Sequence, residues 1–132
     1  MIYLLGTYEH ALVAFIGVLF AFAATCIAIA KLNGYLPKDS GLERIVISAI
    51  RECATNCVRH AHGTYIAVDI QARHGIYSVT ITNDGEKPKG EIIEGGGLSG
   101  LRLLVERENG TMIIHSAPQF ELIIELPQGE TL

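Results

Sequence analysis

A run of 20 residues without a charged side chain, from Ala11 to Ala30, constrains the fold of this chain more than any other feature. A transmembrane helix needs about 20 predominantly apolar residues to cross the hydrocarbon core of a bilayer. Glu9 precedes the run, whereas Lys31 and Lys38 follow it. Because positive charges collect on the cytoplasmic side, we expect a single span that anchors the chain in the cell membrane and leaves the remainder in the cytoplasm.

A water-soluble alternative fits the same run. Thr7 can cap a buried helix from about Tyr8 to Ala23, and a short strand from about Cys26 to Leu32 would follow. That alternative makes the whole chain cytoplasmic. Length and the exclusion of charge favour the membrane span. We therefore predict an apolar N-terminal segment over residues 1–32 and a separate domain over residues 33–132.

Composition narrows the class of protein. The 132 residues leave room for one domain. Hydrophobic residues make up 49% of the chain and charged residues 18%, which excludes a disordered protein. A net charge of −4 provides no basic surface for nucleic acid. Three cysteines without paired spacing argue against a disulfide framework.

A long helix is expected after the turn residues at 33–39. Ser40 and Glu43 have the spacing of a capping box, which predicts a helix from about Gly41 to about Ala61. Its apolar residues recur at helical spacing and form the stripe of a buried face: Leu42, Ile45, Val46, Ala49, Ile50, Cys53, Cys57 and Ala61.

A line of polar residues runs beside that stripe. Glu52 and Asn56 are four residues apart, and Arg59 and His60 follow three and four residues later. This spacing puts the four side chains on one face of the helix, next to the core but not in it. Such a face predicts a helix that borders a cleft.

The remainder of the chain predicts strands in adjacent pairs around a second helix. Alternation and turn signals give strands at about 65–71 and 76–82, a polar loop at 86–94, a helix to about 108, and strands at about 111–116 and 120–126. This order is typical of an α+β domain with a mixed, largely antiparallel sheet covered by helices, and not of a doubly wound parallel sheet.

Three short motifs carry a resemblance to a known family. Residues 50–61 resemble the N box of the ATP-binding domain of sensor histidine kinases, residues 83–85 its first glycine box, and residues 95–102 its second. The boxes occur in the family's order, and the resemblance covers about Leu36 to Pro127. It implies the Bergerat fold of the gyrase, Hsp90, histidine kinase and MutL superfamily, a two-layer α/β sandwich that binds ATP with Mg²⁺.

The chemistry of the N box fits a nucleotide and its metal. Asn56 offers a neutral amide oxygen to Mg²⁺, which prefers hard oxygen ligands. Glu52, one helical turn earlier, can accept a proton or orient a nucleophile near the γ-phosphate. Arg59 and His60 can meet phosphate oxygens from the same face. Each residue alone is common on a solvated helix, but in combination with the two glycine boxes they predict a nucleotide site.

The second glycine box predicts the phosphate contacts. Gly95, Gly96 and Gly97 precede a helix, so backbone N–H groups and the positive end of the helix dipole can face an anion. The resemblance extends the ATP-binding residues over 98–100, which are Leu98, Ser99 and Gly100.

The first glycine box predicts the contact with the base. Asn83 or Asp84 can accept a hydrogen bond from the adenine amino group, while Gly85 lets the base approach. The family's usual sequence is Asp-x-Gly-x-Gly. Counting back from Gly85 puts Asn83 at the position that reads adenine, and Lys87 replaces the second glycine.

Other motifs have simpler explanations. Residues 95–100 match the dinucleotide fingerprint, but that motif directly follows a strand and leads to a parallel one. Cys53, Cys57 and His60 have ligand-like spacing, yet both cysteines fall on the apolar stripe and are expected in the core. No Gly-Lys-Ser/Thr sequence is present, which removes the P-loop.

We therefore predict the ATP-binding module of a two-component sensor histidine kinase, an enzyme that donates the γ-phosphoryl group of ATP to a histidine. The chain shows no phosphoacceptor helix in its sequence, so the histidine would come from another chain or a missing region. The resemblance implies a response regulator or a phosphoacceptor-histidine domain as partner, and it allows a homodimer.

Three alternatives stay open for the function. The first is a non-catalytic ATP-binding regulator, which would bind ATP without phosphotransfer. The second is a fragment of a longer kinase. The third is a kinase of the anti-sigma-factor type, which phosphorylates serine or threonine on a partner protein and is soluble, so a membrane span would argue against it.

Overall fold

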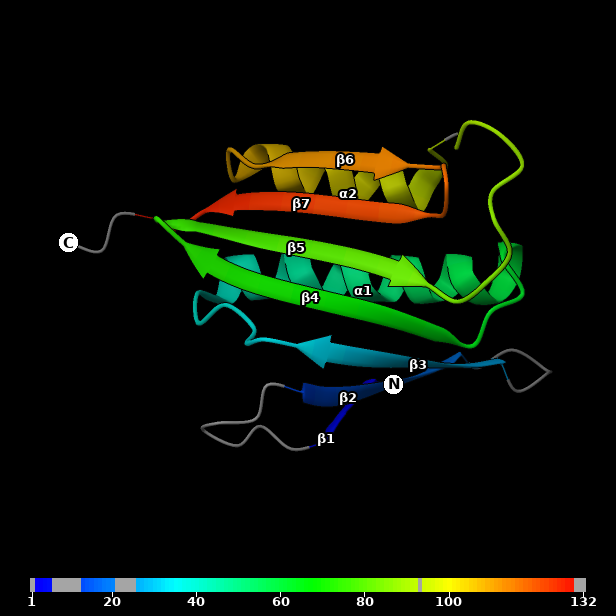
Figure 1. Ribbon diagram of the computed structural model, residues 1–132. Coiled ribbons are helices and arrows are strands. Elements are labelled where there is room, and N and C mark those ends of the chain that lie inside the picture. The colour runs from blue at the N-terminus through cyan, green and yellow to red at the C-terminus, as the bar shows by residue number, and fades with distance from the viewer. Residues whose placement is uncertain (1, 6–12, 21–25, 93, 130–132) are drawn as a thin grey trace.

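The computed structural model describes residues 2–5, 13–20, 26–92 and 94–129. Figure 1 shows a sheet whose helices lie on one face. The strands are β1 (Ile2–Leu5), β2 (Val13–Phe20), β3 (Cys26–Asn33), β4 (Tyr65–Arg73), β5 (Ile76–Asn83), β6 (Thr111–His115) and β7 (Glu121–Pro127). The helices are α1 (Ser40–His60) and α2 (Gly96–Arg107).

The seven strands form one sheet in the order β1-β2-β3-β4-β5-β7-β6. β3 and β4 run parallel, and every other neighbouring pair in this sheet is antiparallel. α1 packs against β3, β4 and β5, while α2 packs against β6 and against α1. This arrangement confirms the predicted α+β fold, a helix layer on a mixed and largely antiparallel sheet of the Bergerat type.

Both predicted hairpins are confirmed. β4 and β5 pair from Ile66 opposite Asn83 to Arg73 opposite Ile76, and β6 pairs with β7. Alternate residues of β4 are buried against the helices, as period-two strands require. β7 also pairs with β5 and therefore lies between β5 and β6, which the sequence analysis did not predict.

The core lies between the sheet and the two helices. The predicted stripe of α1 is buried from Leu42 to Cys57, while Ala61 just beyond the helix is half-buried. Cys53 and Cys57 are buried and unpaired by disulfide, which confirms their expected place in the core. Burial raises the pKa of both thiols, so they stay protonated and uncharged at neutral pH.

The start of α1 differs by one residue from the prediction. Asp39 is the N-cap, and its Oδ1 accepts hydrogen bonds from Gly41 N at 2.8 Å and Leu42 N at 3.0 Å. Ser40 is instead the first residue of the helix. Asp and Ser are about equally good caps, and Pro37-Lys38 before Asp39 gave no signal that separated the two.

Where the structure describes residues 11–30, at 13–20 and 26–30, strands replace the predicted helix. β2 pairs with β3 from Val13 opposite Asn33 to Phe20 opposite Cys26, and β3 also pairs with β4. The prediction of a helix was wrong because a continuous apolar run has no period to read, and buried strands give such runs as readily as helices do. Pairing on both edges satisfies the backbone of β3 without a helix.

The alternative of a buried helix followed by a short strand was correct for the strand. Its strand over Cys26–Leu32 is confirmed as β3, one residue longer, and this strand crosses the predicted boundary between residues 32 and 33. Its helix over Tyr8–Ala23 is replaced by β2 where the structure describes the chain, and residues 8–12 and 21–23 lie outside the described residues. Within the described ranges, no helix is long and apolar enough to cross a membrane.

Candidate functional site

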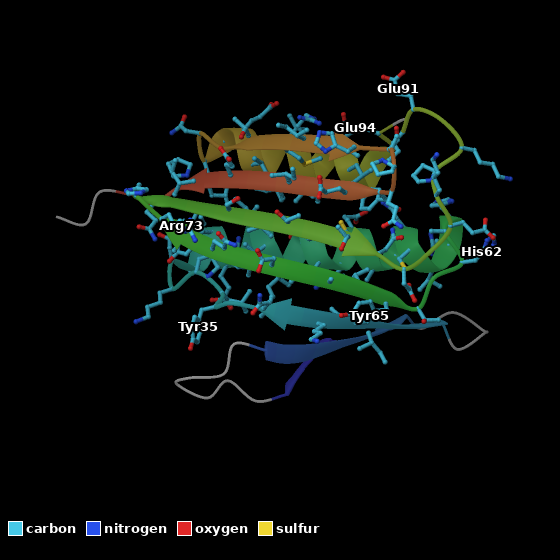
Figure 2. The ribbon with its side chains drawn as sticks, viewed as in Figure 1. Tyr35, His62, Tyr65, Arg73, Glu91 and Glu94 are labelled. Carbon is cyan, nitrogen blue, oxygen red and sulfur yellow. The ribbon has the colours of Figure 1, made fainter. Side chains whose placement is uncertain are left out.

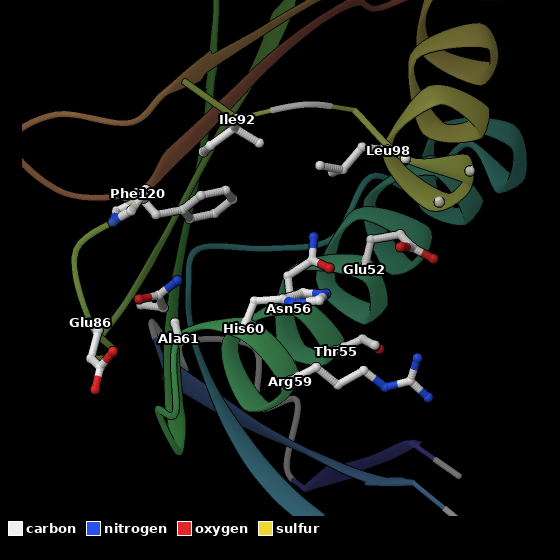
Figure 3. A pocket seen from close by; sticks show the side chains of 15 residues that line it. Glu52, Thr55, Asn56, Arg59, His60, Ala61, Glu86, Ile92, Leu98 and Phe120 are labelled. Carbon is white, nitrogen blue, oxygen red and sulfur yellow. The ribbon is translucent and has the colours of Figure 1, made fainter. Parts of the chain in front are cut away.

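A cavity of about 620 Å³ opens between the C-terminal half of α1, the loop after β5 and the first turn of α2 (Figure 3). Its volume lies in the range of small-molecule sites. It is lined by Glu52, Thr55, Asn56, Arg59, His60, Ala61, Asn83, Glu86, Pro88, Ile92, Gly95, Gly96, Gly97, Leu98 and Phe120.

The polar face of α1 forms one wall of this cavity. Glu52, Asn56, Arg59 and His60 all line it, so the structure brings together the four residues that helical spacing selected. Glu52 and Asn56 are half-buried, whereas Arg59 and His60 are exposed near the end of the helix (Figure 3). The carboxylate and the amide are therefore more shielded from solvent than the two basic side chains, which lie at the exposed mouth of the cavity.

The start of α2 forms the facing wall. Its N-cap is Gly95, which has no side chain to accept hydrogen bonds from the first backbone N–H groups of the helix. Gly96 and Gly97 follow in exposed positions. Since a helix N-terminus favours negative charge, this turn is suited to an anionic ligand.

Glu52 and Gly97 are in direct contact across the cavity. A Cβ atom built on Gly97 would overlap the carboxylate of Glu52, whereas a Cβ on Gly95 or Gly96 would meet no atom within 4 Å. Of the three glycines, only Gly97 is at a position where a Cβ atom would displace a neighbouring side chain, that of Glu52. The predicted role of Glu52 near a γ-phosphate is compatible with this position, because its carboxylate already lies at the anion-favouring turn.

The two candidate base contacts differ in their surroundings. Asn83, at the end of β5, lines the cavity, and its Oδ1 accepts a hydrogen bond from Gly85 N at 2.9 Å. Asp84 does not line the cavity. Of the two residues, Asn83 is therefore the one that a ligand in the cavity would contact.

Asp84 ties the end of β5 to the start of β4. Its Oδ1 accepts hydrogen bonds from Thr64 N at 3.0 Å and Tyr65 N at 2.9 Å, and the Cys57 thiol lies 3.8 Å from the same oxygen. Desolvation acts to raise the pKa of the Asp84 carboxyl, but the backbone N–H groups of Tyr65 and Thr64 outweigh it and hold the pKa below its usual value. The Asp84 carboxylate thus stabilises the fold beside the cavity.

Three other predicted residues lie outside the lining. Gly85 packs against Ala61, where a Cβ would lie 2.6 Å from the Ala61 carbonyl oxygen. Ser99 donates from Oγ to the carbonyl oxygen of Glu94 at 3.4 Å. Gly100 is exposed on α2, whereas Leu98 lines the cavity as expected.

The sequence analysis missed several lining residues. Thr55 could have been found, because it lies three residues after Glu52 and four before Arg59, which puts it on the same face of α1. Ile92 gave a weak signal as an apolar residue in a polar loop. Phe120 gave none, because it reaches the cavity only through the pairing of β7 with β5.

The end of the loop is fastened to α2. Arg102 donates from Nε to Glu94 Oε1 at 2.8 Å and from Nη1 to the carbonyl oxygen of Met112 at 2.7 Å. Both charged side chains are about two-thirds buried. Glu94 thereby holds the loop between β5 and α2 beside the edge of the sheet where β6 lies (Figure 2).

No family model matches the chain, and no curated protein matches it. Solved structures do. The histidine kinase domain of the blue-light activated histidine kinase EL346 from Erythrobacter litoralis matches with a TM-score of 0.54 and 18% identity, over 66% of this chain and 44% of that chain. The histidine kinase AdeS from Acinetobacter baumannii matches with a TM-score of 0.53 and 14% identity, over 77% of this chain and 50% of that chain.

A single-domain structure matches over more of its length. The ATP-binding domain of PrrB from Mycobacterium tuberculosis has a TM-score of 0.53 and 21% identity, over 83% of this chain and 78% of that chain. This chain has the fold of a histidine kinase ATP-binding domain. The predicted resemblance is confirmed at the level of the fold.

The chain spans half or less of the EL346 and AdeS structures, at 44% and 50% of their lengths. The cavity is bordered by residues of all three predicted boxes: the N box on α1, Asn83 of the first glycine box at the end of β5, and the second glycine box at the start of α2. The individual roles of the lining residues stay predictions.

Proposed function

We propose that the cavity binds a magnesium-bound nucleoside triphosphate, ATP by the likeness to histidine kinases, and that the chain is the nucleotide-binding module of a two-component sensor histidine kinase. One observation carries the proposal. The polar face of α1 and the glycine-rich start of α2 border one cavity in a chain with the histidine kinase ATP-binding fold. One wall of the cavity thus provides polar side chains. The other provides the N-terminus of α2, whose positive dipole end favours phosphate.

The phosphate end of the nucleotide has suitable neighbours. A triphosphate carries about four negative charges, so binding depends on cationic and N–H donors more than on a covalent nucleophile. Gly96 and Gly97 contribute backbone N–H groups at the start of α2. Arg59 and His60, at the mouth of the cavity, can donate hydrogen bonds to phosphate oxygens.

Magnesium fits the residues that are present. Asn56 offers a hard, neutral oxygen, and Mg²⁺ commonly takes one or two protein ligands while phosphates and waters supply the rest. The bound ion would neutralise charge on the phosphates. Glu52, one turn away on α1, can accept a hydrogen bond from one nitrogen of an incoming imidazole and thereby aim the other nitrogen at the γ-phosphorus.

The acceptor histidine belongs to another chain in this proposal. A phosphoacceptor-histidine domain would present its imidazole at the exposed mouth near Arg59, and a response regulator would accept the phosphoryl group afterwards. The solved EL346 and AdeS structures are of histidine kinases, and the likeness of fold supports this class of partner. Dimerisation of the module is part of the same proposal.

Nucleotide binding tests the first half of the proposal. We expect ATP to bind in a magnesium-dependent manner, and Asn56→Ala to weaken binding at least about tenfold, because an ion ligand is removed. Arg51→Ala is the matched control, since Arg51 is exposed on α1 and outside the cavity. A folded chain that binds no nucleotide would refute the proposal.

Phosphotransfer tests the second half. Labelled ATP, the chain and a separately purified phosphoacceptor-histidine domain are combined, and label on the histidine is measured. We expect Glu52→Gln to lose transfer while it retains ATP affinity, because the carboxylate acts on the nucleophile. Magnesium-dependent binding without any transfer would favour the non-catalytic regulator instead.

A further inference from the structure

The glycine turn at the start of α2 has few local restraints. Gly95, Gly96 and Gly97 are exposed and line the cavity, and Gly95 at the N-cap lacks a side chain that could bond the first N–H groups of the helix. Glycine also has more backbone freedom than any other residue. A ligand that binds to such a turn loses affinity to the cost of ordering it, unless neighbouring residues already hold it in place.

Glu94, the residue that leads into this turn, is held by two side chains of α2. Its Oε1 accepts a hydrogen bond from Arg102 Nε at 2.8 Å, and its carbonyl oxygen accepts one from Ser99 Oγ at 3.4 Å. Ser99 N also donates to the carbonyl oxygen of Gly95 at 2.9 Å. The helix that follows the glycine turn therefore fixes the residue that precedes it as well (Figure 2).

Arg102 connects Glu94 to the sheet as well as to α2. Its Nη1 donates to the carbonyl oxygen of Met112, on β6, at 2.7 Å. Met112 is 5% exposed, and the side chains of Glu94 and Arg102 are about two-thirds buried, so salt screens this ion pair less than it screens a surface pair. The planar guanidinium donates to both partners in a fixed geometry. Glu94 is thereby fixed relative to both α2 and β6.

Both members of the ion pair lie outside the lining of the cavity. An effect of Glu94 or Arg102 on bound phosphate therefore acts through the position of the glycine turn or through charge. Because the two opposite charges are 2.8 Å apart, the pair presents little net charge to a ligand. Position is therefore the larger of the two effects.

We propose that Arg102 is a positioning residue for the phosphates of the bound nucleotide. By holding Glu94, it keeps the backbone N–H groups of Gly96 and Gly97 in the arrangement that receives phosphate oxygens. The proposal rests on the proposed nucleotide site, since it takes the phosphates to lie at the start of α2. It gives Arg102 a part in ligand affinity in addition to its part in holding the loop.

Arg102→Lys tests the geometry of the guanidinium, because it keeps the charge and loses the simultaneous bonds to Glu94 and Met112. ATP is titrated by calorimetry into the intact chain with excess Mg²⁺. We expect the dissociation constant to rise about tenfold, which corresponds to the loss of roughly one hydrogen bond to phosphate. An ATP affinity equal to that of wild type overturns the proposal.

Arg107→Lys is the matched control for this variant. It makes the same change on the same helix, at an exposed residue of the last turn and outside the cavity lining. We expect it to alter the dissociation constant of ATP by less than about twofold. A change as large as that of Arg102→Lys overturns the proposal, because any arginine of α2 would then have the same effect.

Glu94→Ala separates position from charge and also serves if Arg102→Lys does not fold. It removes an acidic group beside the phosphate turn, so a purely electrostatic role predicts tighter ATP binding. A positioning role predicts weaker binding, to an extent similar to that of Arg102→Lys. Glu91→Ala removes an exposed carboxylate from the same loop and is the control for charge. Tighter or unchanged ATP binding in Glu94→Ala overturns the proposal.

The double variant Arg102→Lys with Glu94→Ala tests whether the two residues act as one unit. If Arg102 acts through Glu94, the double variant should bind ATP about as weakly as either single variant, because the second change removes a contact that is already lost. Fold-changes that multiply would show independent roles and overturn the proposal.

Ile70→Val separates the positioning of the turn from general stability. Ile70 is 6% exposed in the core on β4, outside the cavity lining, so its truncation destabilises the fold without touching the turn. Urea unfolding should show lower stability in Ile70→Val and in Arg102→Lys, but only Arg102→Lys should weaken ATP. Equal weakening in both overturns the proposal. If wild type binds no ATP, the proposed nucleotide function fails as well, whereas wild-type binding that Arg102→Lys leaves intact refutes the positioning role alone.

Discussion

The carboxylate of Glu52 on α1 rests against the backbone of Gly97 on α2, with no room for a Cβ atom on residue 97. This contact connects the N box to the second glycine box, which lie far apart in the sequence. A Cβ atom at residue 97 would therefore displace the Glu52 carboxylate, whatever ligand the cavity takes.

Gly97→Ala should displace Glu52 and weaken nucleotide binding. The added methyl group would overlap the carboxylate, so Glu52 or the first turn of α2 must move. Gly96→Ala is the matched control, because a Cβ there meets nothing within 4 Å, and alanine in place of glycine in a helix is neutral or stabilising by up to about 1 kcal/mol. Urea unfolding and ATP titration measure both effects, and equal behaviour of the two variants would contradict the contact.

Arg102→Lys should loosen the loop that leads into α2. The planar guanidinium bonds Glu94 and the Met112 carbonyl at once, which an ammonium group does not reproduce. We expect a loss of about 1–2 kcal/mol in the free energy of unfolding and faster tryptic cleavage after Lys89 in the native protein. Glu94→Gln keeps the bond to Met112 and should have the smaller effect. Unchanged cleavage in Arg102→Lys would show that the loop is held by other contacts.

The local parts of the fold could be predicted from the sequence. The hairpin of β4 and β5 follows from alternation and a turn, and α1 follows from a stripe that repeats within one helix. The pairing of β7 with β5 joins residues far apart in the chain, and no local pattern reports such a contact. The prediction of a helix over Ala11–Ala30 failed for another reason, because a uniformly apolar run fits a buried strand as well as a helix.

The residues of the site also divide into those that local sequence patterns predict and those that depend on distant strand pairing. Glu52 and Asn56 were found because one helix fixes their relative positions, whereas Phe120 depends on a strand pairing that the sequence does not reveal. Asn83 and Asp84 are neighbours on a strand end, where successive side chains point in opposite directions. The Asp84 carboxylate accepts hydrogen bonds from Thr64 N and Tyr65 N and stabilises the fold, whereas Asn83, bonded to Gly85 N, lines the cavity.

Asp84 should make the stability of the protein depend on acid pH. Its pKa is lower in the folded state than the ordinary value, so its stabilising effect is present above the unfolded pKa and is lost as pH falls through the folded one. We expect Asp84→Asn to be less stable by about 1 kcal/mol at pH 7, with the difference shrinking below about pH 5. Glu91→Gln, at an exposed loop carboxylate, is the control in urea unfolding from pH 7 to pH 3. A difference that grows toward low pH would contradict this account of Asp84.

Substitutions in β3 should distinguish a sheet strand from the membrane helix that the sequence first suggested. Leu32 is 2% exposed and belongs to the core, whereas its neighbour Lys31 is exposed on the other face of the strand. Leu32→Asp would bury an unpaired carboxylate beside the helices, so we expect it to reduce the free energy of unfolding by about 3–5 kcal/mol. Lys31→Glu should change it by less than about 0.5 kcal/mol.

Hydrogen exchange provides the second readout for β3. The parallel pairing of Ile29–Asn33 with Tyr65–Asp69 predicts slowly exchanging amides in both segments. Because the two strands share one ladder, Leu32→Asp should speed exchange in β4 as well as in β3, while Lys31→Glu should leave both slow. Fast exchange over 29–33 in the folded wild type, or a Leu32→Asp variant as stable as Lys31→Glu, would show that β3 does not belong to this sheet.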